Sequence, residues 1–295
     1  MSDRIDIRKT YKLYVGGAFP RSESGRSYLV SDAKGRFVAN AAQASRKDVR
    51  ETVVSARKAF PAWSGATAYN RGQVLYRVAE VMAGRRAQFV DEVASGEGLP
   101  RKRAEAVVTE SVDRWVWYAG WADKLTQVFG NANPVAGPYF DFSLPEPTGV
   151  VATLAPQQSS LLGLVSVVAP VITSGNTCVV VASEHRPLPA ITLGEVMATS
   201  DVPGGVVNVL TGLTGELAPW LASHRDVNAI DLTGADPTHV VELEVAAADN
   251  LKRVFRERQE PDWSDAPGTA RLRHYLETKA EKMGHLIELG DEPDA

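Results

Sequence analysis

The sequence has very few groups for thiol chemistry, since Cys178 is its only cysteine. A single cysteine excludes an internal disulfide and any metal site built from several thiolates. It is consistent with a reducing compartment. The first residues, MSDRIDIRKTYKLYVGG, lack the apolar core of a signal peptide, and the apolar runs are too short or too interrupted to cross a bilayer. We therefore expect a cytoplasmic protein that does not contact membranes.

An excess of positive charge is also missing. Lys and Arg together number 32 against 36 Asp and Glu, which gives a net charge of −4. A mildly acidic chain does not favour a nucleic acid as its partner. No histidine pair has the H-E-x-x-H spacing of a zinc site, and neither a P-loop nor a G-x-S-x-G elbow occurs. The sequence thus predicts no bound metal.

Enough apolar sequence is present for a sizeable core. With 44% hydrophobic residues, the 295-residue chain has room for about two domains. Residues 1–125 are predicted to form an N-terminal helical part. Ser45 starts a helical pattern that Pro61 should end, and amphipathic stretches follow over 70–98 and 100–125.

Residues 126–147 are rich in Pro and Gly, which predicts a hairpin or arm leaving the helical layer. Apolar strands then alternate with helices over 148–257, which predicts an α/β fold with a doubly wound parallel sheet. A polar linker is predicted over 258–270. The C-terminal tail, 271–295, has helical spacing at Leu272, Tyr275, Leu276, Met283 and Leu286.

Several stretches, in their order along residues 11–257, resemble the NAD(P)-dependent aldehyde dehydrogenase superfamily. They are EPTGVVATLAP, GNTCVVVASEHRPLPA, VPGGVVNVLTG, DVNAIDLTG and DNLKRVFRE. The resemblance implies the Rossmann-like cofactor domain of that family, with an N-terminal helical layer and a projecting hairpin. It also implies NAD or NADP as cofactor. The family assembles through the hairpin and a C-terminal strand that joins a neighbour's sheet, and RLRHYLETK (271–279) resembles the approach to that strand. The AEKMGH that follows favours helix.

The departures from the family pattern fall on the residues that carry its chemistry. The family ends its first strand in Pro-Trp-Asn, whose amide helps to hold the oxyanion, whereas here Gln158 carries its amide one methylene further out. The family's ribose clamp of Lys and Glu is reduced to Glu184, because Val181 replaces the lysine. Gly212 and Gly215 match the loop on the adenine side.

The expected phosphate site is altered as well. The family's Thr-Gly-Ser becomes Thr-Gly234-Ala235-Asp236, followed by proline. Asp before Pro predicts a helix N-cap, and its carboxylate would occupy the N–H groups that a pyrophosphate needs. The resemblance therefore implies a cofactor site of Glu184, Gly212, Gly215 and Gly234 whose binding of NAD or NADP is weak or lost.

The chemistry of the family needs an exposed, activated thiolate. Cys178 lies early in a predicted buried strand and is expected to be a core residue. Glu257 matches the general base, but the chain continues with Arg258-Gln259-Glu260 and leaves no room for the domain that carries the nucleophilic cysteine.

Two interpretations follow. The first is a truncated, catalytically inactive member that serves as a scaffold or regulatory subunit of a full-length aldehyde dehydrogenase, or as a homo-oligomer, assembled through 126–147. The surface that a catalytic domain would cover should then be partly apolar, so that a partner subunit could bury it. The second is a residual NAD(P)-binding protein, or half of an oxidoreductase that another chain completes.

Overall fold

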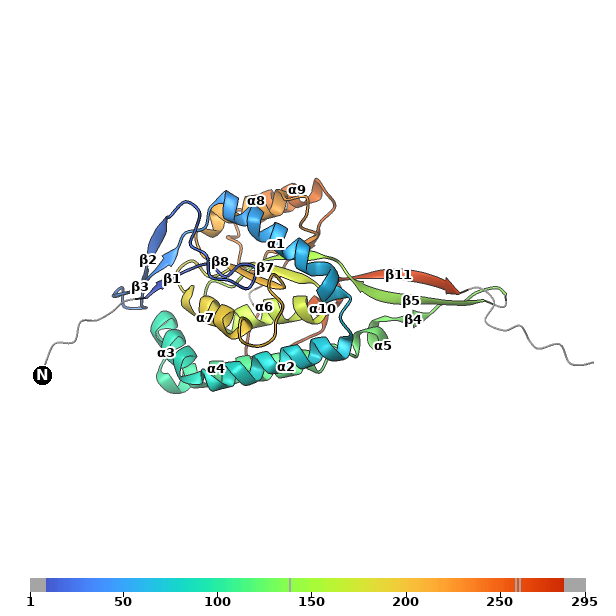
Figure 1. Cartoon of the computed structure of the whole chain (residues 1–295), viewed down its shortest axis with the longest axis horizontal. Helices are drawn as coiled ribbons and strands as arrows, with labels where there is room; N and C mark the ends of the chain where they lie inside the picture. Colours follow the sequence, from blue (N-terminus) through green and yellow to red (C-terminus); the bar gives the residue numbers. More distant parts are fainter. Residues whose placement is uncertain (1–8, 138, 258, 260, 284–295) are drawn as a thin grey trace, which may run out of the picture.

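A five-stranded parallel sheet forms the centre of the molecule (Figure 1). This computed structural model describes residues 9–137, 139–257, 259 and 261–283. The strand order is β10-β9-β6-β7-β8, so the chain runs outward in one direction and then returns to build the other side. The continuous apolar runs are buried on both faces, as expected for a doubly wound sheet. The strands are β6 (Val150–Leu154), β7 (Thr177–Val181), β8 (Val207–Leu210), β9 (Ala229–Asp231) and β10 (Arg253–Phe255). The predicted α/β fold class is confirmed.

Each face of the sheet has its own apolar core. One core joins α1, α8 and α9 to alternate strand residues, and the other joins α6 and α7 to the intervening ones. A further layer of α2, α3 and α4 packs below α6 and α7 (Figure 1). The helices that cover the sheet are α1 (Arg46–Ser64), α6 (Leu162–Thr173), α7 (Leu188–Met197), α8 (Thr214–Ser223) and α9 (Val240–Ala248).

The N-terminal part also contains a small sheet. Its strands β1 (Thr10–Tyr11), β2 (Ser27–Ser31) and β3 (Phe37–Ala42) have the order β1-β3-β2. Ser45 caps α1 in a capping box with Asp48, as the sequence indicated. The prediction that Pro61 ends this helix is wrong, because the helix continues to Ser64. The indole of Trp63 is buried and donates to the Ile172 carbonyl, which anchors the last turn.

The amphipathic stretch 70–98 is two helices rather than one. The chain leaves helical geometry at Arg85, directly after Gly84, and Gly98 ends the second helix in the left-handed region at φ 70°. The stretch 100–125 likewise divides at Gly120. The outer helices are α2 (Ala68–Gly84), α3 (Arg86–Glu97), α4 (Arg101–Ala119) and α5 (Leu125–Phe129).

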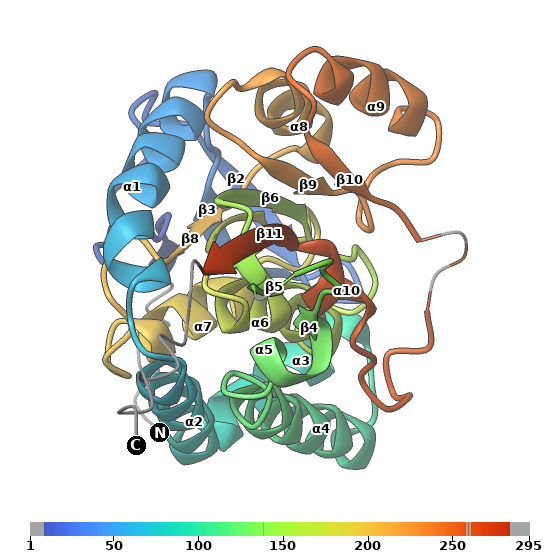
Figure 2. The ribbon, with the colours of Figure 1, turned by 90° about the vertical axis from the view of Figure 1, so that its right-hand side faces the viewer.

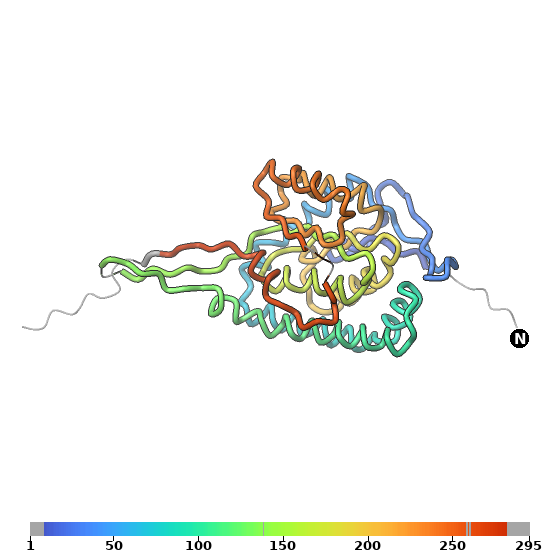
Figure 3. The backbone as a smooth tube through the Cα atoms, turned by 180° about the vertical axis from the view of Figure 1, so that it is seen from behind, coloured from blue at the N-terminus to red at the C-terminus, as the bar shows by residue number. Residues whose placement is uncertain are grey.

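A three-stranded arm projects from the body, as Figures 1 and 3 show. Its strands β4 (Asn131–Ala132), β5 (Phe140–Pro147) and β11 (Leu276–Met283) have the order β11-β5-β4, and all pairs are antiparallel. Within the Pro- and Gly-rich segment, β4 and β5 pair antiparallel, whereas its first residues, through Phe129, belong to α5.

The tail differs from its helical spacing. Among its described residues only α10 (Ala270–His274) is helical, and β11 begins after one further residue. The strand forms because β5 offers it eight residues of antiparallel pairing, which outweighs the helical preference of AEKM (280–283). Residues 284–295, with Leu286, and residues 1–8 lie outside the described range. Among the helices described, none is both long and apolar enough to cross a membrane.

Candidate functional site

A cleft of about 740 Å³ opens where the central strands end. In open parallel sheets, ligands bind outside the carboxyl ends of the strands, at the point where the strand order reverses. Here that point lies between β6 and β9. Residues of α8 and α9 line the cleft, and both helices lie above the central strands in Figure 2. Four lining carboxylates, those of Glu184, Asp236, Glu242 and Glu257, outnumber the single guanidinium of Arg256. This balance disfavours a polyanionic ligand.

The loop after β9 closes tightly over the end of β6. Gly234 donates its N–H to the Leu154 carbonyl at 2.9 Å, and a Cβ at this position would lie 1.9 Å from the Ala155 oxygen. Only glycine fits there. The side chain of Gln157 then spans the strand ends, since its Nε2 donates to Ala155 O at 3.0 Å and its Oε1 accepts from the Glu184 N–H at 3.0 Å.

Gln158, predicted at the oxyanion position, is exposed at the mouth of the cleft. Its Oε1 accepts a hydrogen bond from Nη1 of Arg186 at 2.8 Å, and its main-chain oxygen accepts another at 2.7 Å. Arg186 therefore holds the amide through its oxygen, and the NH₂ group takes no part in this contact.

The predicted ribose clamp is engaged within the protein. The Glu184 carboxylate accepts the main-chain N–H of Thr214, the first residue of α8. A carboxylate in this place caps the helix and interacts favourably with its dipole. Val181 is fully buried in the core that includes α8, so it offers nothing to a ligand.

The two glycines predicted on the adenine side differ in how much room their surroundings leave for a side chain. Gly212 has φ 142°, and a Cβ there would lie 3.1 Å from the Ala44 main-chain nitrogen. Gly215 faces open space in the first turn of α8 and lines the cleft. The structure therefore brings Glu184, Gly215 and Gly234 to one cleft, whereas Gly212 supports the turn before α8.

Asp236 binds the main chain as expected, but it does not cap α9. The helix begins at Val240, and Asp236 instead closes a turn by accepting the Thr238 N–H at 2.9 Å and the Thr238 hydroxyl at 2.7 Å. Pro237 at the next position favours a turn before any helix. The hydrogen bond from the Thr238 hydroxyl, followed by that from its N–H, lowers the pKa of Asp236. Asp236 and Ala235 both line the cleft, so the segment after Gly234 presents a charged carboxylate.

Glu257 does not stand free at the cleft wall. Its Oε1 lies 3.1 Å from Nη2 of Arg271, a residue of α10. The same guanidinium donates to the Thr233 hydroxyl at 2.8 Å and pairs with the fully buried Asp231 at 3.1 Å. Burial alone would lower the pKa of Arg271, but the carboxylates of Asp231 and Glu257 outweigh it and raise that pKa.

The sequence analysis missed this network. Asp231 ends a short apolar strand and Arg271 lies in a tail with helical spacing, so nothing local indicated that they meet. Tyr275 also belongs to it, since its hydroxyl donates to Asp231 at 2.8 Å. Burial, followed by the Asp231 charge, raises the pKa of Tyr275 well above its usual value.

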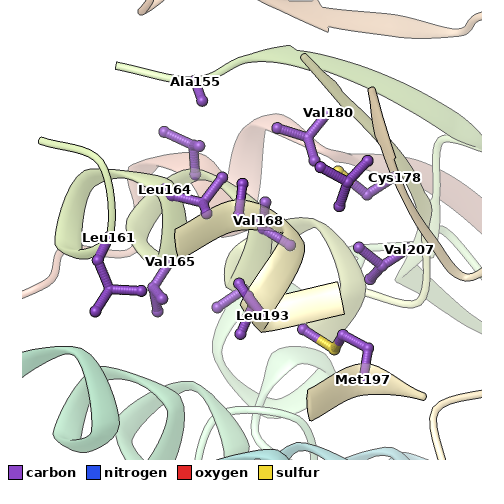
Figure 4. Close-up of a cluster of buried hydrophobic side chains, with 14 of the residues drawn as sticks. Ala155, Leu161, Leu164, Val165, Val168, Cys178, Val180, Leu193, Met197 and Val207 are labelled. Atoms are coloured by element: carbon purple, nitrogen blue, oxygen red, sulfur yellow. The ribbon is translucent and has the colours of Figure 1, made fainter. Parts of the chain in front are cut away.

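Cys178 lies inside the protein, on the sheet face that packs against α6 and α7 (Figure 4). Its exposure is 0%, and its sulfur lies 3.7 Å from the Thr153 hydroxyl. Burial raises the pKa of the thiol to about 12. The thiolate that nucleophilic attack requires is therefore scarce at neutral pH.

The cleft can be compared with the needs of NAD or NADP. Its ribose side keeps Glu184, but that carboxylate already caps α8, and the partner position is the buried Val181. On the side where the pyrophosphate would lie, the cleft contains Asp236, whose carboxylate accepts a hydrogen bond from the Thr238 N–H. The volume fits a nucleotide, whereas the groups at the phosphate position do not fit a pyrophosphate. In the part of the chain that the structure describes, no group of His, Cys, Asp and Glu could hold a metal ion.

Comparisons with known proteins agree with this architecture. The aldehyde dehydrogenase family profile matches residues 19–258. Retinal dehydrogenase 2 of Gallus gallus is 33% identical over 258 residues, which are 86% of this chain and 49% of that protein. Benzaldehyde dehydrogenase of Antirrhinum majus is 31% identical over 254 residues, covering 83% of this chain and 46% of its own. The chain spans about half the length of the curated relatives it matches.

Solved structures give the same result. PnpE of Pseudomonas sp. WBC-3 superposes with a TM-score of 0.78 at 28% identity, over 83% of this chain and 50% of that one. An NAD⁺ complex of aldehyde dehydrogenase from Bacillus cereus has a TM-score of 0.78 at 23% identity, with the same two coverages, and shows the fold alone. The sequence match, the sheet order and these superpositions together establish that the chain belongs to the aldehyde dehydrogenase family.

Proposed function

We propose that this chain is a non-catalytic member of its family that acts as a scaffold or regulatory subunit of a full-length aldehyde dehydrogenase in the cytoplasm. The observation that carries the proposal is the burial of Cys178, the only thiol. Aldehyde oxidation in this family begins with thiolate attack on the carbonyl. A thiol of 0% exposure, behind the sheet and away from the cleft, cannot reach a carbonyl there.

The general-base position supports the same conclusion. Glu257 is bound to Arg271, which α10 supplies. This ion pair engages the Glu257 carboxylate within the protein. On the way from Glu257 to β11, Arg114 fixes the chain by donating to the carbonyls of Trp263 and Asp265 at 2.9 and 2.8 Å.

An apolar strip on α9 offers a surface for the dehydrogenase. Val241 and Val245 are 64% and 65% exposed, one turn apart on the outer face of the helix, and Leu251 beyond its end is 91% exposed. Contiguous exposed apolar side chains on a helix mark an interaction surface. The carboxylates of Glu242 and Asp249 flank the strip, so we expect the dehydrogenase to present basic groups around an apolar face.

Co-purification from the native host tests this function. We expect the tagged chain to carry a full-length aldehyde dehydrogenase, identified by mass spectrometry, and the double variant Val241→Glu with Val245→Glu to lose it. Val54→Glu is the matched control, because Val54 is 57% exposed on α1, away from the strip. In parallel, the pure chain with NAD⁺ and an aldehyde should form no NADH. NADH formation that Cys178→Ser abolishes would contradict the proposal.

A second candidate function is residual binding of NAD or NADP, alone or as half of an enzyme that another chain completes. The cleft of about 740 Å³ supports it, since Glu184, Gly215 and Gly234 still line a space of nucleotide size. The capped state of Glu184 and the charge of Asp236 oppose it. Calorimetric titration separates the two functions, because micromolar binding favours the second.

A further inference from the structure

A second cavity lies apart from the cleft, at the end of the molecule opposite the arm. It measures about 320 Å³ and opens between the N-terminal sheet, α3 and the start of α7. The small sheet and α3 lie at the left of Figure 1, and the arm lies at the right. Pockets that bind small molecules begin at about 300 Å³ and combine an apolar lining with a few polar groups. His185 borders both this cavity and the cleft, whereas the other residues of the two linings differ.

The accessible walls of this cavity are mostly apolar. Tyr11, Val30 and Leu188 line it, and each of them is at most 8% exposed. Val38 and Pro189 belong to the same lining. The cavity can therefore remove a hydrocarbon or aromatic group from water, which favours a ligand with an apolar body.

One polar group in the lining lacks a partner. Glu92 uses only one of its two carboxylate oxygens. Its Oε1 accepts hydrogen bonds from the hydroxyls of Thr192 and Tyr11, at 2.7 and 3.2 Å, and from the Gln88 amide at 3.1 Å. Its Oε2 is buried, and no group in the described part of the chain donates to it. A buried polar atom without a partner is rare in folded proteins and points to a bound water, ion or ligand.

Glu92 also differs from the other carboxylates of the lining in its charge balance. Asp32 is paired with Arg36 at 2.7 Å, and Asp91 is paired with Arg101 at 2.9 Å. No ion-pair partner of Glu92 occurs among the residues that the structure describes. A positively charged head group beside Glu92 would therefore meet a carboxylate that the protein leaves without a counter-ion.

The surroundings of Glu92 favour a cation over an anion. Burial raises its pKa, although its three hydrogen bonds and the charge of Lys9 act in the opposite direction. Lys9 itself is paired with Glu195. The guanidinium in the lining, that of Arg186, is engaged by Gln158, since Nη1 donates to the main-chain oxygen at 2.7 Å and to Oε1 at 2.8 Å. An ammonium group next to Glu92 would stabilise the charged carboxylate, whereas an anion would add to its charge.

We propose that this cavity binds a small primary amine with an aromatic or branched apolar body, whose ammonium group binds the Glu92 carboxylate. The ammonium has three N–H donors and supplies the partner that Oε2 lacks. Because Oε2 is shielded from water, the carboxyl group turns towards the cavity when the amine binds. The apolar body fills the space between the N-terminal sheet and α7. The site lies outside the cleft and the α9 strip, so this proposal and the proposed function can fail independently.

Probes that share one body and differ in the head group test the class of ligand. In calorimetric titrations of the full chain, phenethylamine should bind and 2-phenylethanol should bind about tenfold more weakly, because a hydrogen bond between two charged groups is the stronger one. Phenylacetate, with a negative head, and methylamine, with no apolar body, should not bind. No binding of phenethylamine at millimolar concentration, or equal affinity for the amine and the alcohol, overturns the proposal.

A substitution at Glu92 tests the residue that holds the head group. Glu92→Gln keeps the shape of the side chain and removes its charge, so phenethylamine should bind about tenfold more weakly. The matched control is Glu110→Gln, because Glu110 also has a buried Oε2 without a partner but lines neither of the two cavities. It removes the same charge from the protein and should leave the affinity unchanged. Equal losses in the two variants, or no loss in Glu92→Gln, contradict the role of Glu92.

Filling the cavity gives a test that does not depend on charge. Gly96 of α3 lines the cavity, and a Cβ there would lie 3.8 Å from Cγ of Arg186, which is an ordinary contact. Gly96→Leu should therefore fold and exclude the apolar body of the amine. Gly84→Leu, at an open position of α2, should bind phenethylamine as the wild type does. Neither substitution costs helix propensity, and thermal unfolding checks that both chains are folded. Unchanged affinity in a folded Gly96→Leu chain would place the amine elsewhere and overturn the proposal.

Discussion

Arg271 and Asp231 form an ion pair at 3.1 Å in which the carboxylate is fully buried. The pair joins α10 to the end of a central strand, and the same guanidinium reaches Glu257 at the cleft wall. The two residues are held from other sides as well, since Tyr275 donates to Asp231 at 2.8 Å and the Phe255 ring lies 4.5 Å from the guanidinium carbon. Stability and the state of the general-base position therefore depend on one side chain.

Arg271→Met should strongly destabilise the protein. Removing one partner of a buried pair leaves the other charge uncompensated, which costs about 3 kcal/mol. Urea unfolding followed by circular dichroism measures the loss. Arg273→Met is the matched control, because Arg273 is exposed on the same short helix, and it should change the free energy of unfolding by less than about 0.5 kcal/mol. Equal stability of the two variants would show that the ion pair carries no net stabilisation.

The thiol of Cys178 should be unreactive while the protein is folded. It has 0% exposure, and burial raises its pKa to about 12, so both access and thiolate are lacking. A maleimide at pH 7.5 should label the native chain only as fast as it unfolds, and should label it at once in urea. Val54→Cys provides the control for reagent activity, because Val54 is 57% exposed. Rapid labelling of the native wild-type chain would refute a core role.

Tyr118 should make stability fall in alkali. Burial raises its pKa to about 12, although Arg271 and Arg114 act in the opposite direction. The folded pKa exceeds the unfolded value of about 10, so this contribution is complete below pH 10 and is lost as the pH rises towards 12. Relative to Tyr118→Phe, the wild type should lose about 1 kcal/mol between pH 8 and pH 11. Tyr76→Phe, at an exposed ring, should follow the wild type.

The central sheet could be predicted from the sequence because its signals are local. The valine-rich runs that became β6, β7 and β8 are mostly apolar, and their short length between turn residues is typical of strands covered on both faces. The start of α1 was equally local, since Ser45 and Asp48 form the capping box that their spacing indicated.

The tail and the Arg271 network could not be predicted, because their structure depends on distant residues. The apolar residues Leu272, Tyr275 and Leu276 are buried as their spacing predicts. The helix that they indicate is limited to α10, which packs onto α6. From Leu276 onward β5 decides the conformation by offering an open edge. Ion pairs between residues 40 positions apart leave no periodic trace in a single sequence.

Asp236→Ser should strengthen binding of NAD. Asp236 places a carboxylate next to Gly234, where its hydrogen bonds with Thr238 lower its pKa and keep it charged at neutral pH. Replacing it by serine keeps a group that can accept the Thr238 N–H and removes a negative charge, so affinity should rise about tenfold at low salt. Adding Val181→Lys should not raise affinity further, because Val181 is fully buried in the apolar core and a lysine there would bury an unpaired ammonium.

The matched control for this variant lies outside the cleft. Asp262 closes the same kind of turn, accepting the Ser264 N–H at 2.9 Å and the Ser264 hydroxyl at 2.6 Å, and it does not line the cleft. Asp262→Ser removes the same charge from the protein, so it should leave the affinity unchanged in calorimetric titrations at matched ionic strength. If both variants gain equally, the net charge of the chain governs binding rather than the carboxylate in the cleft. If neither variant gains affinity, the charge of Asp236 is not what excludes the dinucleotide. The shape of the main chain, with Gly234 held against β6, then blocks the position of the pyrophosphate.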